Sequence, residues 1–309
     1  MAVFVNTNYS ALQGQRYLNN VNNSLTTTYQ RLSSGMRINS AKDDAAGLQI
    51  ADRLTSQING LNQGNRNASD GIALAQTIES GMDEISGMLQ KVRTLAVQAS
   101  NGTNTAEDRA ALAKEASSLV AEMQRISQQT TYGGKKILAG GGTQNANKTA
   151  TIYGTAGKGS AGGTMTLQVG SNKGDTITFC VANFTFSVIA KGASKGFKGN
   201  EIKEASKGAL VAFSDAGAAQ NLIESMDALI AKVDSQRAAL GAIQNRLESS
   251  IRNQSNVAAN EADARSRIRD ADFAEESANL SQQSIIQQAA ASMLMQANTR
   301  PQLGLSLLG

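Results

Sequence analysis

Asp43 and Asp44 are adjacent carboxylates, an arrangement that could serve acid–base chemistry or bind a cation. They stand just before a long helical pattern, and negative charge is favourable at the start of a helix. The simpler interpretation is therefore that they begin a helix.

Met123, Met293 and Met295 could bind a soft metal, but methionine at helical spacing usually fills a hydrophobic core.

The residue types that most catalytic sites need are scarce. The chain of 309 residues has no His, which excludes Ser–His–Asp triads, Cys–His nucleophiles and histidine metal sites. Its single cysteine, Cys180, excludes an intrachain disulfide and thiolate zinc sites, and its strand-like surroundings predict a small buried side chain. No nucleophile–base pair or phosphate loop is evident. We therefore predict a protein that is not an enzyme and needs no cofactor.

The net charge of +4 is concentrated in the middle of the chain, where eight Lys stand against three acidic residues between about 140 and 208. These Lys are scattered among Gly and Ser, whereas nucleic-acid binding needs a basic stripe, so we predict no nucleic-acid partner. No apolar run reaches the roughly 18 residues that span a bilayer, which predicts no membrane insertion. The N-terminus lacks the basic and apolar stretches of a cleavable signal, so an exported chain would need another route.

Three segments carry apolar residues alternately three and four positions apart, and the two chain ends repeat this spacing over shorter distances. Such spacing places the residues on one stripe of a helix, and the stripe must be buried against another helix. The single proline, Pro301, interrupts none of the three segments. The stripes are Ile78, Met82, Ile85, Leu89, Val92, Ala96 and Ala99; Leu112, Ala116, Leu119, Met123 and Ile126; and Leu222, Met226, Leu229, Val233, Gln236, Leu240, Ile243 and Leu247.

The helix limits are also marked in the sequence. Asn101-Gly102 ends one pattern, with Gly102 able to take a left-handed conformation. Thr105 can cap the next helix, and the acidic residues after it suit the helix dipole. We expect helices over 44–100, 105–129 and 215–263.

Residues 139–209 are rich in Gly and lose the helical spacing. Three runs alternate apolar and polar residues, as strands with one buried face do: Met165 to Val169, Ile177 to Val181 and Phe184 to Val188. The fold class is therefore mainly α, a long helical rod or coiled coil of paired N- and C-terminal arms with a small β-rich central insertion. We expect this insertion to be exposed at the far end of the rod.

Both chain ends are rich in Asn, Gln, Ser and Thr. They bury too little apolar area to offset an ordering entropy of roughly 1–2 kcal/mol per residue. We expect residues 1–40 and 270–309 to be disordered in the monomer and to fold on assembly.

Several motifs in order at both ends of the chain resemble those of bacterial flagellins. The resemblance covers about 1–139 and 210–309. It is carried by Ser33 to Leu48, Leu89 to Gln98, Leu240 to Leu247, Gln287 to Asn298 and the ending Leu305 to Leu308.

The resemblance implies a division into three regions. Residues 1–43 and 265–309 would form D0, a terminal coiled coil. Residues 44–138 and 205–264 would form D1, a helical rod with a β-hairpin near Gly133-Gly134, and 139–204 would be a short variable outer β-rich region.

The resemblance also implies a structural subunit that polymerises with itself into the flagellar filament for motility. Such subunits are exported without a cleaved signal by the flagellar type III pathway and lie outside the cell. Implied partners are an export chaperone on the C-terminal helix, a filament cap protein and the hook–filament junction protein. For D0 packing in the polymer we select Leu18, Leu25, Leu32, Ile286, Met293 and Leu294.

Some flagellins are recognised by Toll-like receptor 5 through D1. The matching positions are Gln90, Lys91, Leu95 and Gln98. Lys91 stands where the receptor-active pattern usually has Arg, and Lys lacks the planar fork of Arg.

Two other functions fit parts of the pattern. A hook–filament junction protein shares the terminal helices but would normally lack the Leu89–Gln98 segment and the C-terminal ending. A cytoplasmic signalling coiled coil has similar heptads, but needs a tight helical hairpin where this chain has a Gly-rich β region.

Overall fold

The computed structural model describes residues 7–140, 152–153, 162–186, 202–205, 208–211, 213 and 215–305. The chain divides into two compact units, unit 1 with Met1–Asn59 and Val257–Gly309, and unit 2 with Gly60–Asn256. Helices make up most of the described chain, and the β strands are short and lie in its middle. The predicted class, mainly α with paired terminal arms and a small β region, is confirmed.

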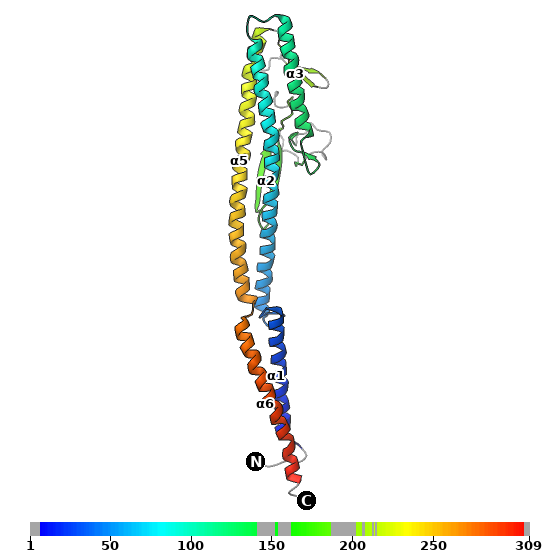
Figure 1. Ribbon diagram of the computed structural model, residues 1–309, viewed down its shortest axis with the longest axis vertical. Coiled ribbons are helices and arrows are strands. Elements are labelled where there is room, and N and C mark those ends of the chain that lie inside the picture. The colour runs from blue at the N-terminus through cyan, green and yellow to red at the C-terminus, as the bar shows by residue number, and fades with distance from the viewer. Residues whose placement is uncertain are drawn as a thin grey trace. The chain divides into compact units, whose positions relative to one another are not determined.

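Unit 2 is built on three helices that run side by side, α2 (Ala45–Ala99), α3 (Ala106–Gln129) and α5 (Ala216–Arg269) (Figure 1). The predicted stripes form its core. All seven residues of the α2 stripe are at most 2% exposed. Six of the eight stripe residues on α5 and two of the five on α3 are buried. Leu112, Leu119, Ile126 and Ile243 pack partly buried against the core, and Gln236 lies outside it.

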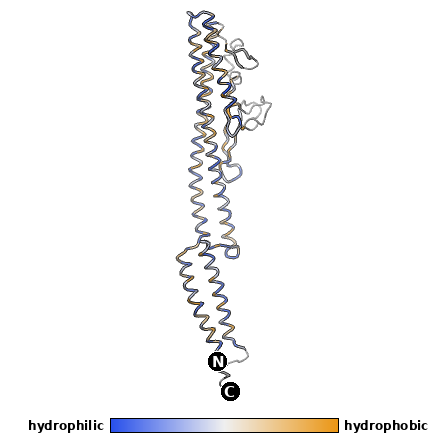
Figure 2. Tube along the Cα trace, turned by 45° about the vertical axis from the view of Figure 1, so that its right-hand side comes forward, coloured by the Kyte–Doolittle hydropathy of each residue, from blue (hydrophilic) through white to orange (hydrophobic). Residues whose placement is uncertain are grey.

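Polar pairs fix α2 against α5 at the margins of this core. Gln244 Nε2 donates to Glu79 Oε2 over 2.9 Å, and Arg237 forms an ion pair with Asp83 at 3.1 Å. Figure 2 shows the hydrophobic residues along these helices interleaved with hydrophilic ones, as amphipathic helices require.

The predicted limits of α2 and α3 are correct to within one residue, and Thr105 forms a capping box with Asp108. Two details differ from the prediction. Helix α5 continues six residues past 263, and Arg267 and Arg269 in its last turn suit the negative end of the helix dipole. Gly102 has no positive φ. Instead, Arg109 Nε donates to the carbonyl oxygen of Ala99 at the end of α2 over 3.1 Å.

Two short antiparallel hairpins follow α3. Strands β1 (Thr131–Tyr132) and β2 (Lys135–Lys136) are joined by Gly133 and Gly134, whose φ of 57° and 77° fit a tight two-residue turn. Strands β3 (Gly163–Gln168) and β4 (Thr176–Val181) pair over their full length.

The β3–β4 hairpin buries one face, as its alternating sequence predicts. Leu167, Ile177, Phe179 and Val181 are buried. Cys180 lies on the opposite face and is exposed, so the prediction of a buried thiol was wrong: the alternation of side chains turns it outward. The third predicted run forms no strand in its described part, 184–186, although Phe184 and Phe186 are buried; Val188 lies outside the described residues.

The β3–β4 hairpin packs along α2 instead of standing free at the far end of the helices. Glycines on one face of α2 allow this close approach: a Cβ on Gly64 would overlap the carbonyl oxygen of Val169, and a Cβ on Gly71 would overlap the Leu167 side chain. The expected exposed module is therefore corrected for residues 162–186. Their apolar face becomes part of the unit 2 core, because two strands alone cannot bury it.

A third hairpin, β5 (Ile202–Ala205) and β6 (Gly208–Val211), is attached to α3. Ser117 Oγ accepts a hydrogen bond from Val211 N at 3.1 Å and donates one to Val211 O at 3.2 Å. Val211 is buried in the core of unit 2.

Unit 1 contains the two terminal helices, α1 (Tyr9–Ser34) and α6 (Phe273–Leu305), which lie side by side and antiparallel. We predicted disorder for 1–40 and 270–309, but the structure has helices over much of both segments. Asn8 caps α1 by accepting from Ala11 N, and Gly35 ends it in the left-handed conformation with a φ of 69°. Polar pairs between the two chain ends, which the sequence did not reveal, hold the helices together.

Candidate assembly surface

Several polar contacts join α1 and α6. Gln287 Nε2 donates to Asn22 Oδ1 over 2.8 Å, and Thr28 Oγ1 donates to Gln283 Oε1 over 3.3 Å. Nearer the α5–α6 junction, Arg31 forms an ion pair with Glu276 at 2.9 Å. Thr28 and Glu276 are the only buried residues among the side chains described for these two helices. These polar contacts contribute to the pairing, and no large apolar side chain described for the two helices is fully buried.

The six residues selected for polymer packing occupy two kinds of position. Leu18, Leu25, Leu32 and Leu294 are half-buried, and Leu294 Cδ1 lies 3.2 Å from the place a Cβ on Gly14 would take. Ile286 is 42% exposed and Met293 is 70% exposed. Met295 is 67% exposed as well, so the expectation that methionines fill cores is wrong for α6 and correct for Met123, which is buried.

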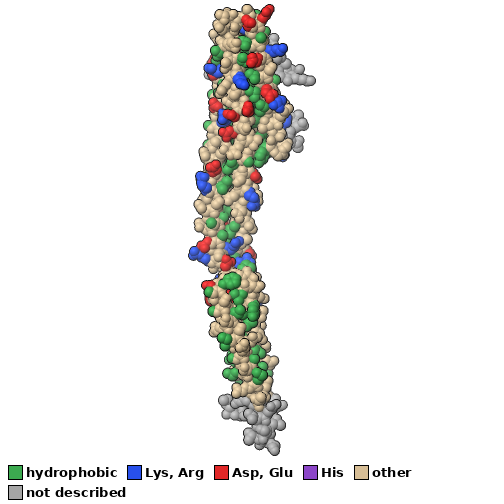
Figure 3. All heavy atoms as spheres, viewed as in Figure 1, with side chains coloured by type: hydrophobic (Ala, Val, Ile, Leu, Met, Phe, Trp, Pro, Cys, Tyr) green, Lys and Arg blue, Asp and Glu red, His purple; other side chains and the backbone are tan. Residues whose placement is uncertain are grey.

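Exposed apolar side chains are concentrated in unit 1. Among the described residues, twelve large hydrophobic side chains are exposed, and eleven of them belong to this unit. Figure 3 shows hydrophobic side chains gathered over α1 and α6. The eleven are Tyr9, Leu12, Tyr17, Tyr29, Ile50, Val257, Phe273, Ile285, Ile286, Met293 and Met295. Exposed apolar patches of this kind usually mark interaction surfaces.

The same helices lack charge over most of their length. No Asp, Glu, Lys or Arg occurs between 17 and 30 in α1 or between 277 and 299 in α6. A surface without charges can be covered by another protein surface without the cost of removing ions from water. The composition of this pair therefore favours burial in an assembly.

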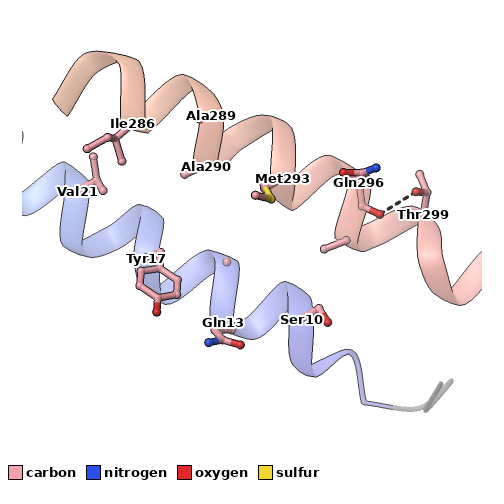
Figure 4. Close-up of a pocket in the computed structure, with 12 residues that line it drawn as sticks. Ser10, Gln13, Tyr17, Val21, Ile286, Ala289, Ala290, Met293, Gln296 and Thr299 are labelled. Carbon is pink, nitrogen blue, oxygen red and sulfur yellow. Dashed lines mark hydrogen bonds between the residues drawn. The ribbon is translucent and has the colours of Figure 1, made fainter. Parts of the chain in front are cut away.

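One side of the α1–α6 pair is hollowed into a groove of about 930 Å³. Figure 4 shows residues of both helices along it, with Ile286 near Val21, and Met293 on the α6 side. Small residues of both helices leave the space open. The lining residues are Ser10, Gln13, Gly14, Tyr17, Val21, Ile286, Ala289, Ala290, Met293, Gln296, Ala297 and Thr299.

Residues 35–44 connect α1 to α2, and this connection is fixed to the end of α5. Arg37 N donates to Arg269 O over 2.7 Å, and Met36 forms a β-bridge with Asp270. Ala271 N donates to Gly35 O over 3.0 Å, so residues 35–37 and 269–271 are held side by side in a defined register. Sequence reasoning did not identify this junction, because its partners are more than 200 residues apart.

Asp43 and Asp44 shape this connection. The backbone N–H and hydroxyl of Ser40 and the backbone N–H of Asn39 donate to Asp43, and these hydrogen bonds lower the pKa of its carboxyl. Asp44 Oδ1 accepts from Gly47 N over 2.9 Å at the start of α2, as the helix-start interpretation predicts. Among the described residues no cluster of acidic or Cys side chains could hold a metal ion.

The four receptor-matching residues lie on α2 within unit 2. Gln90, Lys91 and Gln98 are exposed, whereas Leu95 is partly buried against the core. Arg93 lies among them and forms an ion pair with Asp227 of α5 at 2.5 Å. Three of the four side chains are thus available to a partner, and Leu95 also contributes to packing.

None of the described helices is long and apolar enough to cross a membrane. Family models match both ends of the chain: the bacterial flagellin N-terminal helical region over residues 5–143, and the bacterial flagellin C-terminal helical region over residues 223–308.

Full-length relatives give the same result. The chain is 35% identical to flagellin D of Vibrio anguillarum and 36% identical to flagellin A of Vibrio cholerae, with 100% of each chain covered. Among solved structures, a putative flagellar hook-associated protein from Vibrio parahaemolyticus is similar with a TM-score of 0.54. At 15% identity, over 74% of this chain and 100% of that one, this likeness concerns the fold alone.

Proposed function

Because this chain belongs to the bacterial flagellin family, whose members are the structural subunits of the flagellar filament, we propose that unit 1 is the surface through which its copies polymerise. Flagellins serve motility as components of a filament and are not enzymes.

The observation that carries the proposal is the concentration of exposed apolar side chains in unit 1, eleven of the twelve among the described residues. At about 25 cal/mol per Å² of apolar area, burial of several such side chains per contact stabilises an assembly substantially. Contacts between two different surfaces of the same molecule generate an open helical polymer if the rotation does not close a ring. Unit 2 buries its stripes internally and leaves Val97 as its one large exposed apolar residue in the described part.

We assign residues 1–43 and 265–309 to D0, 44–138 and 205–264 to D1, and 139–204 to a short outer region. The compact units divide the chain at 59/60 and 256/257 instead, so unit 1 includes the first turns of α2 and the last turns of α5. In this assignment the connection 35–44 joins the two regions, and the charge-free parts of α1 and α6 belong to D0.

Deletion of residues 270–309 should abolish filaments and leave the helices of unit 2 folded. The deletion removes α6 and with it five of the exposed apolar residues, but it removes no residue of the unit 2 core. Salt-induced polymerisation followed by electron microscopy gives the first result, and circular dichroism of the monomer gives the second. Tubes of normal width from the shortened chain would contradict the assignment.

The other partners of the chain follow from the family. An export chaperone that covers α6 in the cell would shield Ile285, Met293 and Met295 before assembly. A filament cap protein and the hook–filament junction protein would contact the same terminal helices at the ends of the polymer. The filament location implies export to the outside of the cell, for which we propose the flagellar route without a cleaved signal.

We also propose recognition by Toll-like receptor 5 through Gln90, Lys91, Leu95 and Gln98. The exposure of three of these side chains on one helix supports a contact surface. Lys91 cannot make the bidentate contacts of an Arg, which reduces the affinity expected of this chain.

The variant Leu95→Ala should reduce receptor signalling at least tenfold in a reporter-cell assay. Removal of the leucine side chain takes away apolar contact at the centre of the segment, and 1.4 kcal/mol corresponds to a factor of ten. Because Leu95 also packs against the core, the monomer of each variant should be compared by circular dichroism. Leu119→Ala, a partly buried leucine on α3, is the matched control and should signal normally. Equal signalling by the Leu95 variant and the unchanged chain would exclude this contact.

A further inference from the structure

The groove between α1 and α6 is suited to a neutral helix face. None of its twelve lining residues is charged, and Gly14, Ala290 and Ala297 keep it open where longer side chains would fill it. Tyr17 on α1 and Met293 on α6 are exposed along it and provide apolar walls. A helix that entered the groove would complete a three-helix packing, because the groove is already bounded by two parallel walls of side chains (Figure 4).

The chain itself carries a ridge that matches this groove. Ile285, Gln288, Ser292 and Met295 of α6 follow one another at intervals of three, four and three, which places them on one helix face. All four are exposed and none lines the groove. At 1.5 Å per residue the ridge from Ile285 to Met295 is about 15 Å long, and the α1 wall from Ser10 to Val21 is about 16 Å long.

The exposed face of α1 that carries Tyr9, Leu12 and Arg16 is less well suited to the groove. Tyr9 and Leu12 are apolar, but Arg16 continues the same face. A guanidinium placed in a groove without an acidic side chain would lose its water without gaining a partner. The α6 ridge avoids this cost, since α6 has no charge between 277 and 299.

We propose that the α6 ridge of one copy docks into the α1–α6 groove of a second copy. This inference rests on the proposed function and names the two surfaces that meet. Ile285 and Met295 pack against Tyr17 and Met293. The Gln288 amide and the Ser292 hydroxyl form hydrogen bonds with polar side chains of the groove, such as Gln13 and Gln296. Ridge and groove are different surfaces, so each copy keeps one of each free for the next copy, and the contact propagates without closing.

A disulfide across this contact tests the docking. In a Cys180→Ser chain, which has no other thiol, Gln13→Cys places a cysteine in the groove and Ser292→Cys places one on the ridge. Filaments of this double variant are oxidised and run on a non-reducing denaturing gel. A ladder of covalent dimers, trimers and longer chains is expected, because every copy offers one cysteine of each kind. A second pair, Gln296→Cys with Gln288→Cys, joins the same two surfaces by an independent route.

Controls separate the docking from the polymerisation itself. Asn23→Cys combined with Ser292→Cys has an exposed α1 cysteine outside the groove and should give no ladder, and neither should any single-cysteine variant. Normal filaments without a ladder from either groove–ridge pair would overturn the docking and leave the proposed function intact. An equal ladder from the Asn23 control would overturn it too. Failure of the Cys180→Ser chain to polymerise at all would contradict both the proposed function and the docking.

Discussion

A chain that carries Ile286→Lys and Met293→Lys should form no filaments at concentrations where the unchanged chain polymerises. Burial of an Ile or Met side chain contributes about 1.5–3 kcal/mol, so loss of two such burials weakens the contact by at least about 3 kcal/mol. Because each 1.4 kcal/mol is a factor of ten, the lowest concentration that supports polymerisation should rise more than a hundredfold. The two side chains are 42% and 70% exposed, so the monomer should keep its helix content.

The control must add the same charge elsewhere. Thr164→Lys with Thr176→Lys also adds two positive charges, but on the exposed polar face of the β3–β4 hairpin in unit 2. This control should polymerise near the normal concentration, as measured by sedimentation and electron microscopy. If both double variants fail alike, net charge and not the unit 1 surface governs assembly.

The variant Gly64→Ala should destabilise the monomer by about 1–2 kcal/mol. An added methyl group would overlap the Val169 carbonyl oxygen and would lie 3.2 Å from Gln254 Oε1, so the hairpin must move off α2. Overpacking of this kind costs about 1–3 kcal/mol, and the better helix propensity of Ala returns up to about 1 kcal/mol of it. Chemical denaturation followed by circular dichroism measures the change in the free energy of unfolding.

Gly87→Ala is the matched control on the same helix. Gly87 is exposed, and nothing lies within 4 Å of the position of an added Cβ. This variant should therefore stabilise the monomer by up to about 1 kcal/mol through helix propensity alone. The two substitutions are therefore expected to change the free energy of unfolding in opposite directions. A stabilising Gly64→Ala would mean that the hairpin does not pack against α2 as described.

The helical framework of unit 2 could be predicted from the sequence because its signals are local. The spacing of Ile78, Met82, Ile85 and Leu89 predicts a buried stripe without any knowledge of the helix that covers it. Thr105 caps α3 through hydrogen bonds to residues next to it in the sequence. The twofold alternation in β3 and β4 likewise predicts strands and their buried face. The prediction for Cys180 failed because it followed the general tendency of free cysteines to be buried and not this alternation.

Features that depend on contacts far apart in the chain could not be predicted. Nothing near Gly64 indicates that Val169 will approach it, and nothing near Arg37 indicates its contact with Arg269. The pairing of the terminal arms was predicted, but the polar contacts between α1 and α6 were not, since nothing in the sequence near Asn22 or Thr28 indicates which residues they contact. The groove depends on how the two helices meet side chain by side chain and so could not be predicted either.

Hydrogen–deuterium exchange of monomer and filament tests whether unit 1 becomes buried through assembly. In the monomer the α1–α6 pair buries little apolar surface, so amides over 9–34 and 273–299 should exchange within seconds, while the unit 2 core stays protected. In the filament the same terminal amides should become protected by at least a hundredfold. Equal protection of these two helices in monomer and filament would mean that assembly does not bury unit 1.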